Sequence, residues 1–388
     1  MIISAIQILQ VRIPFRLRFS HASRKRDATS AVIVKICFDN GLSGYGEGTP
    51  REYVTGETFR ACVAFLLEHA PQLPGRRITG MEDLLAIREE ILSFPDAAFC
   101  PSAVCALETA FLDALGRLAG LPLSRLVRPR HAWQPVTYSA ILPFLPLPEL
   151  EKYLQLIAAL KIPHLKLKIG SPEDAIHLKT ARDMLGEEVD IRVDANNAWS
   201  LSEALDHLGP LLAYRISAIE EPLKRPTPRN LRSLVQALQV PVILDESFRN
   251  RQDMESLLGK GLQPERFILN LRLSKCGGYI RTLELALLAR EYHFQIMMGC
   301  HVGETGILAA AGRHFAQSCP DLRYVEGAFG NLLLQEDVIA ETLQFGSEGK
   351  AAGLDSPGLG VTIRMDSLLR YSKVLSASPT LGNTLSLP

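Results

Sequence analysis

The sequence has no excess of charge of either sign. Its 42 lysines and arginines equal its 42 aspartates and glutamates, so no long-range field draws the protein toward phosphate backbones or anionic lipid. We therefore expect neither nucleic acid nor a membrane surface as a partner. A small neutral or zwitterionic molecule fits this balance better.

Long apolar runs and cysteine motifs are missing as well. No apolar stretch approaches the roughly 18 residues that a membrane span needs, and the N-terminal residues lack the pattern of a secretory signal. The seven cysteines are scattered, odd in number and form no C-x-x-C pair, which argues against a disulfide framework or a zinc knuckle. We expect a cytoplasmic protein with buried, reduced thiols.

What is present is an ordinary globular composition, with 47% hydrophobic and 22% charged residues over 388 positions, enough for one or two domains. The first part, residues 1–130, predicts an α+β domain. Three apolar segments rich in β-branched residues predict an antiparallel meander: residues 2–13, 31–38 and 42–47. Three more have helical periodicity: residues 58–70, 81–93 and 102–119.

In residues 131–353, short apolar segments alternate with helix-length amphipathic stretches. The eight segments are residues 136–141, 164–169, 191–194, 217–220, 242–245, 267–271, 294–298 and 323–326. The polar residues that end five successive segments are spaced by 26, 26, 25 and 25 positions, the length of a βα unit with short loops. They are Lys168, Asp194, Glu220, Asp245 and Asn270. Eight such units predict a (β/α)8 barrel, whose strand ends form one mouth and carry the active site.

The tail, residues 354–388, is too long to be only the last helix of the barrel. It contains a strand-like stretch at residues 360–364. We expect the tail to fold back onto the first domain.

Three acidic residues end three consecutive predicted strands: Asp194, Glu220 and Asp245. Carboxylates brought this close repel one another, so the arrangement is stable mainly when a divalent cation neutralises it. Oxygen ligands alone favour Mg²⁺, or Mn²⁺, over Zn²⁺. A single acid at a strand end could equally be solvated or cap a helix, but three in register predict a metal site.

Lysines flank these acids. Lys166 and Lys168 lie two positions apart on the preceding strand and therefore on one face of it, and each is expected to lower the pKa of the other toward that of a usable base. Lys275 follows the sixth strand, on the opposite side of the mouth. Two opposed bases can remove a proton from one face of a carbon and return it on the other. The alternatives are an exposed lysine pair and a solvated loop lysine.

In this order, the residues resemble the enolase superfamily, and within it the muconate-lactonizing-enzyme subgroup of the mandelate racemase/muconate lactonizing enzyme family. The matching motifs are Lys166 and Lys168 in KLK, Asp194 in VDAN, Glu220 in IEEP, Asp245 in LDES and Lys275 in SKCGG. The resemblance covers nearly the whole chain. It implies an α/β fold in which an N-terminal α+β capping domain, completed by the tail, covers a modified (β/α)8 TIM barrel.

The resemblance also implies a chemistry. Asp194, Glu220 and Asp245 would bind Mg²⁺, which holds a substrate carboxylate while Lys168 and Lys275 act as the acid/base pair at the adjacent carbon. Lys166 would assist electrostatically. The residues that flank the metal ligands are candidate supports for them: Asn196, Glu221, Glu246 and Ser247.

The reaction implied first is racemisation or epimerisation of an N-acyl amino acid or dipeptide-like carboxylate. Two other activities that use the same enolate intermediate stay open: a muconate-type cycloisomerase and a dehydratase resembling o-succinylbenzoate synthase. A reading of another class is a non-catalytic barrel that binds a carboxylate. A homo-oligomer is plausible for the family, but no interface is evident in the sequence.

Substrate contacts are expected from two segments of the capping domain, residues 14–26 and 48–57, which look like the loops that close over the substrate in this family. Further candidates lie at the last strands of the barrel. The substrate-binding candidates are Arg24, Tyr53, Asn270, His301, Glu304 and Glu326. The alternative for Arg24 is a solvated basic loop, and His301 is either a pocket residue or a packed histidine. Dipeptide epimerases carry Asp-x-Asp after the eighth strand, whereas this chain has only Glu326 there.

Overall fold

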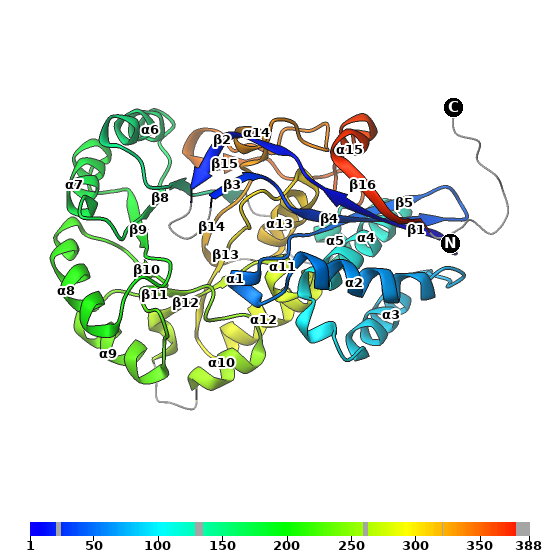
Figure 1. Cartoon of the computed structure of the whole chain (residues 1–388), viewed down its shortest axis with the longest axis horizontal. Helices are drawn as coiled ribbons and strands as arrows, with labels where there is room; N and C mark the ends of the chain where they lie inside the picture. The colour runs from blue at the N-terminus through cyan, green and yellow to red at the C-terminus, as the bar shows by residue number, and fades with distance from the viewer. Residues whose placement is uncertain (21–24, 129–134, 259–262, 320, 378–388) are drawn as a thin grey trace.

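The computed structural model describes residues 1–20, 25–128, 135–258, 263–319 and 321–377. It contains a capping part built around one antiparallel sheet and a barrel part built around one parallel sheet (Figure 1). In the described residues, no helix is both long enough and apolar enough to cross a membrane. Of the seven cysteines, all unpaired, five are buried as expected, while Cys37 and Cys300 are partly exposed.

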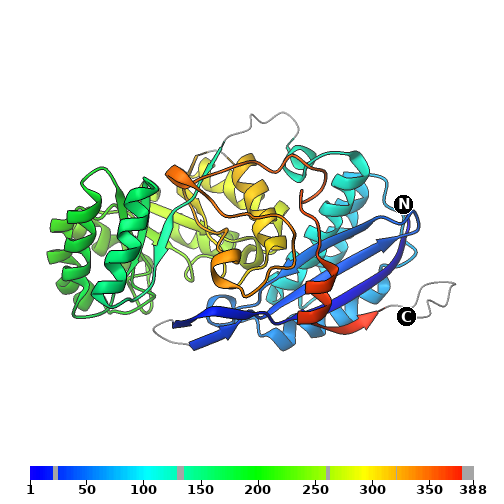
Figure 2. The same ribbon diagram turned by 90° about the horizontal axis from the view of Figure 1, so that it is seen from above.

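The capping sheet has the strand order β16-β1-β4-β5 and is antiparallel. Its strands are β1 (Ile3–Val11), β4 (Ala31–Phe38), β5 (Ser43–Gly48) and β16 (Ser372–Ala377). The first three confirm the predicted meander. The fourth comes from the tail and lies beside β1 (Figure 2), which confirms that the tail completes this domain.

The strand expected at residues 360–364 is wrong. Gly358 and Gly360 have positive φ angles of 70° and 69° and form turns instead, and only Ile363 makes an isolated bridge, to Ile339. The amide of Leu359 donates to the buried carboxylate of Asp113, so this stretch packs against the capping domain as a turn. The pairing strand lies further on, after α15 (Met365–Tyr371).

Residues 14–26 were expected as a loop, but the described part of this segment lies in the hairpin strands β2 (Pro14–Ser20) and β3 (Lys25–Ala28). The base of the hairpin is fixed to the segment that follows the last barrel strand. Arg16 Nε donates to the carbonyl of Leu334 at 2.7 Å, and the amide of Gln335 donates to that of Pro14 at 2.9 Å. Arg24 lies outside the described residues.

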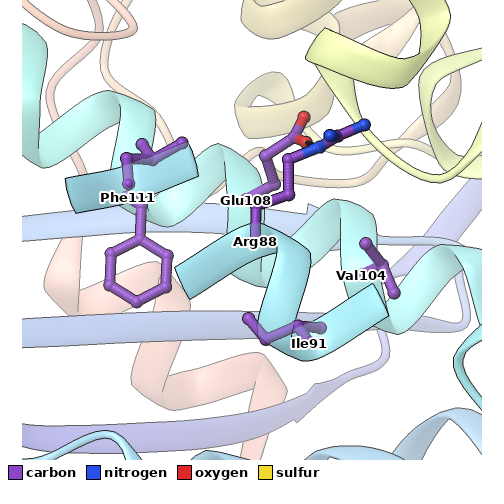
Figure 3. A pocket seen from close by; sticks show the side chains of 6 residues that line it. Arg88, Ile91, Val104, Glu108 and Phe111 are labelled. Atoms are coloured by element: carbon purple, nitrogen blue, oxygen red, sulfur yellow. Dashed lines mark hydrogen bonds and ion pairs between the residues drawn. The ribbon is translucent and has the colours of Figure 1, made fainter. Parts of the chain in front are cut away.

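Helices cover one face of the capping sheet, three of them near the predicted positions and two short ones, at residues 52–55 and 123–127, that were not predicted. They are α1 (Glu52–Thr55), α2 (Phe59–His69), α3 (Met81–Ser93), α4 (Pro101–Ala119) and α5 (Leu123–Val127). All residues of α4 from Pro101 to Gly116 are buried, because this helix packs against β5 as well as its helical neighbours. A cavity of only about 10 Å³, the space of one water molecule, lies between α3 and α4 beside Arg88 and Glu108 (Figure 3).

The barrel sheet has eight parallel strands in chain order. They are β7 (Ala140–Leu142), β8 (His164–Lys168), β9 (Asp190–Asp194), β10 (Ile219–Glu220), β11 (Val242–Leu244), β12 (Phe267–Leu271), β13 (Gln295–Met298) and β14 (Leu322–Val325). The amide of Ser139, just before β7, donates to the carbonyl of Val325 in β14 at 2.8 Å. This bond joins the first strand to the last and confirms the predicted barrel.

Helices follow the strands on the outside of the sheet, with α6 to α10 along the edge of the molecule in Figure 1. The helices are α6 (Leu147–Ala159), α7 (Asp174–Leu185), α8 (Leu201–Leu211), α9 (Pro228–Leu238), α10 (Arg251–Leu258), α11 (Leu273–Cys276), α12 (Tyr279–Glu291) and α13 (Gly306–Ser318). The α-helix that directly follows β14 is the four-residue α14 (Gly330–Leu333), so the barrel is of a modified type. The short strands β6 (Val136–Thr137) and β15 (Lys350–Ala351) pair beside it. The limits at residues 130 and 353 stay predictions.

Buried carboxylates of the capping domain cap the N-termini of barrel helices. Glu47 on β5 accepts hydrogen bonds from the amides of Thr305 and Leu308 at the start of α13. Glu108 on α4 accepts one from the amide of Ile280 at the start of α12 and pairs with Arg88. Burial raises the pKa of both carboxyls to about 7.

This predicts a pH dependence of stability that Glu47→Gln removes. The pKa of Glu47 is raised from 4.5 to about 7, so its contribution is complete below pH 4.5 and is lost as the pH rises to about 7. Over that window, the stability of the variant relative to wild type should rise by about 1.4 kcal/mol per pH unit and then level off. Urea denaturation at pH 5, 6, 7 and 8 measures it, and a difference independent of pH would contradict the prediction.

Candidate active site

The carboxyl ends of neighbouring barrel strands bring a row of charged side chains together. The sheet order β8-β9-β10-β11-β12 sets their sequence in space, which is the sequence in the chain. In that order they are Lys168, Asp194, Glu220, Asp245 and Lys275. All five are buried, with at most 7% of their surface exposed. The row therefore has an ammonium group at each end and three carboxylates between them.

Each outer lysine contacts the nearest acid. Lys168 Nζ lies 3.1 Å from Asp194 Oδ2 and also donates to the side chain of Asn196. Lys275 Nζ donates to Asp245 Oδ1 at 2.9 Å and to the backbone carbonyls of Asp245 and Asn270. The two ends of the row are thus built alike, although Lys168 comes from a strand and Lys275 from α11.

Lys166 occupies the centre of the cluster. Its Nζ lies 3.1 Å from Asp194 Oδ2, 2.7 Å from Glu220 Oε2 and 3.3 Å from Glu326 Oε1. Burial acts to lower the pKa of Lys166, but the three carboxylates outweigh it and hold the pKa well above its usual range. The expectation that Lys168 lowers the pKa of Lys166 is therefore wrong, because acids on the neighbouring strands surround Lys166.

Two buried arginines join the cluster, and both were missed in the sequence. Arg272 Nη2 donates to Asp245 Oδ2. Arg192, fully buried, donates to Glu326 Oε1 at 2.7 Å and to Ser139 Oγ at 3.1 Å. Arg272 lies two positions after Asn270, and Arg192 lies two positions before Asp194. Because side chains alternate along a strand, each arginine is expected on the same face as its candidate residue, so the sequence contained a signal for both.

The four predicted supporting residues lie around the row. Glu221 accepts hydrogen bonds from the amide of Asp245 at 2.6 Å and from the amide and hydroxyl of Ser247. The amide of Asn196 donates to Asp194 Oδ1 at 3.0 Å. Burial and then the charge of Asp245 raise the pKa of Glu246 to about 8. Glu221 therefore fixes the loop after β11, and Asn196 links Lys168 to Asp194.

Most of the predicted substrate-binding residues lie at the mouth, but they differ in setting. Asn270 is fully buried and donates to Glu220 Oε1 at 3.4 Å. Glu326 is paired with Arg192 and Lys166. Glu304 Oε1 accepts a hydrogen bond from the amide of His301 at 2.5 Å, and burial raises the pKa of its carboxyl to about 8. Tyr53 lies on α1 with 38% of its surface exposed.

The donor set of the row fits a divalent cation. Glu220 Oε2 is buried, and its close partner among the described residues is Lys166 Nζ, at 2.7 Å. Burial and the neighbouring acids, which outweigh Lys166, raise the pKa of Glu220 to about 8. The acids Asp194, Glu220 and Asp245 offer only oxygen, the ligand that Mg²⁺ prefers. The three carboxylates thus form a buried set of oxygen ligands, which in this structure the neighbouring lysines and arginines neutralise.

Comparisons with known proteins agree with this fold. Residues 149–367 match the family model "Enolase C-terminal domain-like", and residues 3–127 match "Mandelate racemase / muconate lactonizing enzyme, N-terminal domain". The chain belongs to the mandelate racemase/muconate lactonizing enzyme family of the enolase superfamily, and within it to the muconate-lactonizing-enzyme subgroup, as the motifs suggested.

Similar proteins of the family include epimerases and racemases. An L-Lys-D/L-Arg epimerase of Desulforapulum autotrophicum is 31% identical over 86% of this chain and 92% of its own. An N-succinyl-L-Arg/Lys racemase of Bacillus cereus is 27% identical over 94% of this chain and 96% of its own. A dipeptide epimerase of Enterococcus faecalis, solved with Mg and the dipeptide L-Leu-L-Tyr, is 26% identical with a TM-score of 0.81 and covers 93% of this chain and 100% of its own.

The central position of Lys166 predicts a large effect on stability. Lys166→Met leaves three buried carboxylates short of one cation, and removing one partner of a buried ion pair costs about 3–5 kcal/mol. Urea denaturation in EDTA measures the loss. The control is Lys179→Met, which removes an exposed ion pair with Asp183 and should leave stability nearly unchanged, since exposed ion pairs contribute little. Equal losses in the two variants would show that Lys166 does not neutralise the cluster.

Proposed function

We propose that the chain is a Mg²⁺-dependent racemase or epimerase that removes the proton next to a substrate carboxylate and returns it on the opposite face. The substrate class is an N-acyl amino acid or a dipeptide-like compound. The observation that carries the proposal is the row described above, in which Lys168 and Lys275 lie at opposite ends of three carboxylates. A carbon held over the middle of this row has one lysine on each side.

The two lysines supply a balanced proton transfer. The neutral amine of one lysine takes the proton from the carbon, and the ammonium of the other gives a proton to the opposite face. The substrate receives a proton from the second lysine in place of the one that it gave to the first, its configuration is inverted, and the two lysines exchange protonation states. Rigid attachment serves this reaction, since Lys168 is the last residue of β8 and three hydrogen bonds hold Lys275.

The cation would be held by Asp194, Glu220 and Asp245, with Mn²⁺ as an alternative to Mg²⁺. Its contribution when bound is positive charge against the substrate carboxylate, where negative charge grows as the proton leaves. Lys166 adds a fixed ammonium group beside these acids. Glu221, through the amide of Asp245, keeps that residue at the end of its strand.

The relatives support the choice of reaction. The similar proteins from Desulforapulum autotrophicum, Bacillus cereus and Enterococcus faecalis are named as epimerases or racemases of dipeptides or of N-succinyl amino acids. All three match most of the chain, which keeps the residues that proton abstraction and return require. Cycloisomerisation and dehydration use the same acids and differ in the need for Lys275.

Metal binding can be tested without a substrate. A cation that binds only the folded protein raises its free energy of unfolding, by about 2.7 kcal/mol at a hundredfold excess over Kd. We expect Mg²⁺ and Mn²⁺ to raise the melting temperature of the wild type and to leave that of Glu220→Gln unchanged. The control, Asp183→Asn on the exposed face of α7, should respond like the wild type. An equal response of Glu220→Gln would place the metal elsewhere.

The reaction is tested by mass-spectrometric exchange of the α-proton in D₂O, with Mg²⁺, across pools of dipeptides and N-acyl amino acids. Wild type should incorporate deuterium and lose optical purity, and Lys168→Ala should lose at least about 10²-fold in rate, as expected when a general base is removed. Lys275→Ala separates the readings, because inversion needs both lysines whereas syn elimination needs only Lys168. Absence of exchange in every pool would refute the proposed reaction.

A further inference from the structure

The two proposed acid/base lysines differ in how the fold holds their backbone. Lys168 ends β8, and hydrogen bonds join that strand to β7 on one side and to β9 on the other. Lys275 lies in α11, a helix of four residues. A single helical turn is not stable by itself, because nucleation of a helix is unfavourable. The position of Lys275 therefore depends on what packs around α11.

The capping domain supplies part of that packing. All four residues of α11 are buried, and the helix packs against α4. The amide of Thr49 donates to Ser274 Oγ at 2.9 Å, and Ser102 Oγ donates to the backbone carbonyl of Ser274 at 3.5 Å. Ser274 precedes Lys275 in the chain, so two residues of the capping domain contact α11 directly beside the lysine.

Glu108 of α4 contacts the chain just after the other end of α11. The helix ends in a turn at Gly277 and Gly278, whose φ angles are 89° and 111° and whose amides donate to the carbonyl of Leu273. Two residues further on, the amide of Ile280 donates to Glu108 Oε1 at 2.9 Å. A Cβ at position 278 would lie only 2.4 Å from the same oxygen. The turn therefore fits closely around this carboxylate.

A buried arginine keeps Glu108 in place. Arg88 Nε donates to Glu108 Oε2 at 2.9 Å, and Figure 3 shows the two charged groups side by side. One oxygen of the carboxylate thus has its partner in the capping domain, and the other has its partner in the barrel. Both side chains are buried, and a buried amide such as that of Ile280 needs an acceptor. The turn after α11 therefore depends on Glu108.

We propose that Glu108 is a positioning residue for Lys275, which fixes the turn after α11 and so holds the lysine on its side of the substrate. The catalytic part rests on the proposed function, since that function assigns Lys275 to proton transfer, whereas the support of α11 follows from the protein alone. Lys168 does not share this support, because neighbouring strands fix it. Loss of Glu108 should therefore impair proton transfer on one face of the substrate and spare the other.

Deuterium exchange in D₂O with Mg²⁺, measured separately from each α-configuration of the substrate, reads the two faces. Each lysine carries several exchangeable hydrogens, so it can return deuterium to the face from which it took the proton. Lys275→Ala should stop exchange from one configuration and thereby assign that configuration to Lys275. Glu108→Leu should slow the same exchange about tenfold or more, since misplacing a catalytic group by about 1 Å can cost about 10²-fold in rate. Exchange from the other configuration should stay nearly unchanged.

The matched control is Glu47→Leu, which removes another buried carboxylate, one that caps α13 instead of contacting the turn after α11. It should destabilise the protein without changing the ratio of the two exchange rates. Glu108→Gln keeps an oxygen acceptor for the amide of Ile280 and should restore the wild-type ratio. If Glu108→Leu does not fold, Gly278→Ala disturbs the same contact from the barrel side and should lower the same rate.

Equal slowing from both configurations, or no slowing from either, would overturn the proposal. Amide hydrogen exchange of the full-length protein, read by mass spectrometry, is a second readout that needs no substrate. Glu108→Leu should lose protection in residues 272–280, and Glu47→Leu should keep it there. Unchanged protection in Glu108→Leu would show that Glu108 does not hold α11. If no substrate exchanges with the wild type, the proposed function fails, while amide exchange still decides the support of α11.

Discussion

Neutralisation of buried charge is the constraint on which the rest of the barrel mouth depends. An unpaired carboxylate in the interior is unstable by several kcal/mol, yet Asp194, Glu220 and Asp245 end adjacent strands within one buried cluster. Lysines and arginines from the same strands and their ends compensate them: Lys166 contacts the first two, while Lys275 and Arg272 contact the third. The strand ends can carry these acids only because the facing side chains of the same sheet are cations.

The alternation of side chains along a strand also determines how the capping domain packs against the barrel. On β5, alternate glycines let the strand approach α4, while Glu47 between two of them and Thr49 just after the strand contact barrel residues. This strand and the residue after it therefore link the two domains by hydrogen bonds. The tail strand β16 closes the far edge of that sheet on β1, so both ends of the described chain stabilise the surface from which Glu47 and Thr49 project.

The parts of the site that the sequence predicts are those with a fixed period. Spacings of 25 and 26 residues reveal the strand ends, so Lys168, Asp194, Glu220 and Asp245 could be placed on one mouth. What escapes is set by contacts between strands. The raised pKa of Lys166 depends on acids from β9, β10 and β14. Local sequence patterns predict neither the turn at Gly358 and Gly360 nor the hairpin within residues 14–28. Both elements depend on contacts with surfaces elsewhere in the chain.

The proposed catalytic groups and the expected substrate contacts differ in how firmly the structure holds them. The charged row is attached to barrel strands, and the hydrogen bonds between these strands and the ion pairs within the row fix its position. The proposed catalytic side chains therefore keep the same positions relative to one another whichever substrate binds. The groups expected to meet the rest of a substrate lie outside the barrel sheet, on α1, on the hairpin side and on the segment after β13, where contacts such as Thr49 to His301 connect the capping domain to the barrel. Changes at these points alter which oxygen or charge is recognised at small cost in stability. In the proposed reaction, the barrel would therefore carry the chemistry, and the contacts of the capping domain with it would influence the choice of substrate.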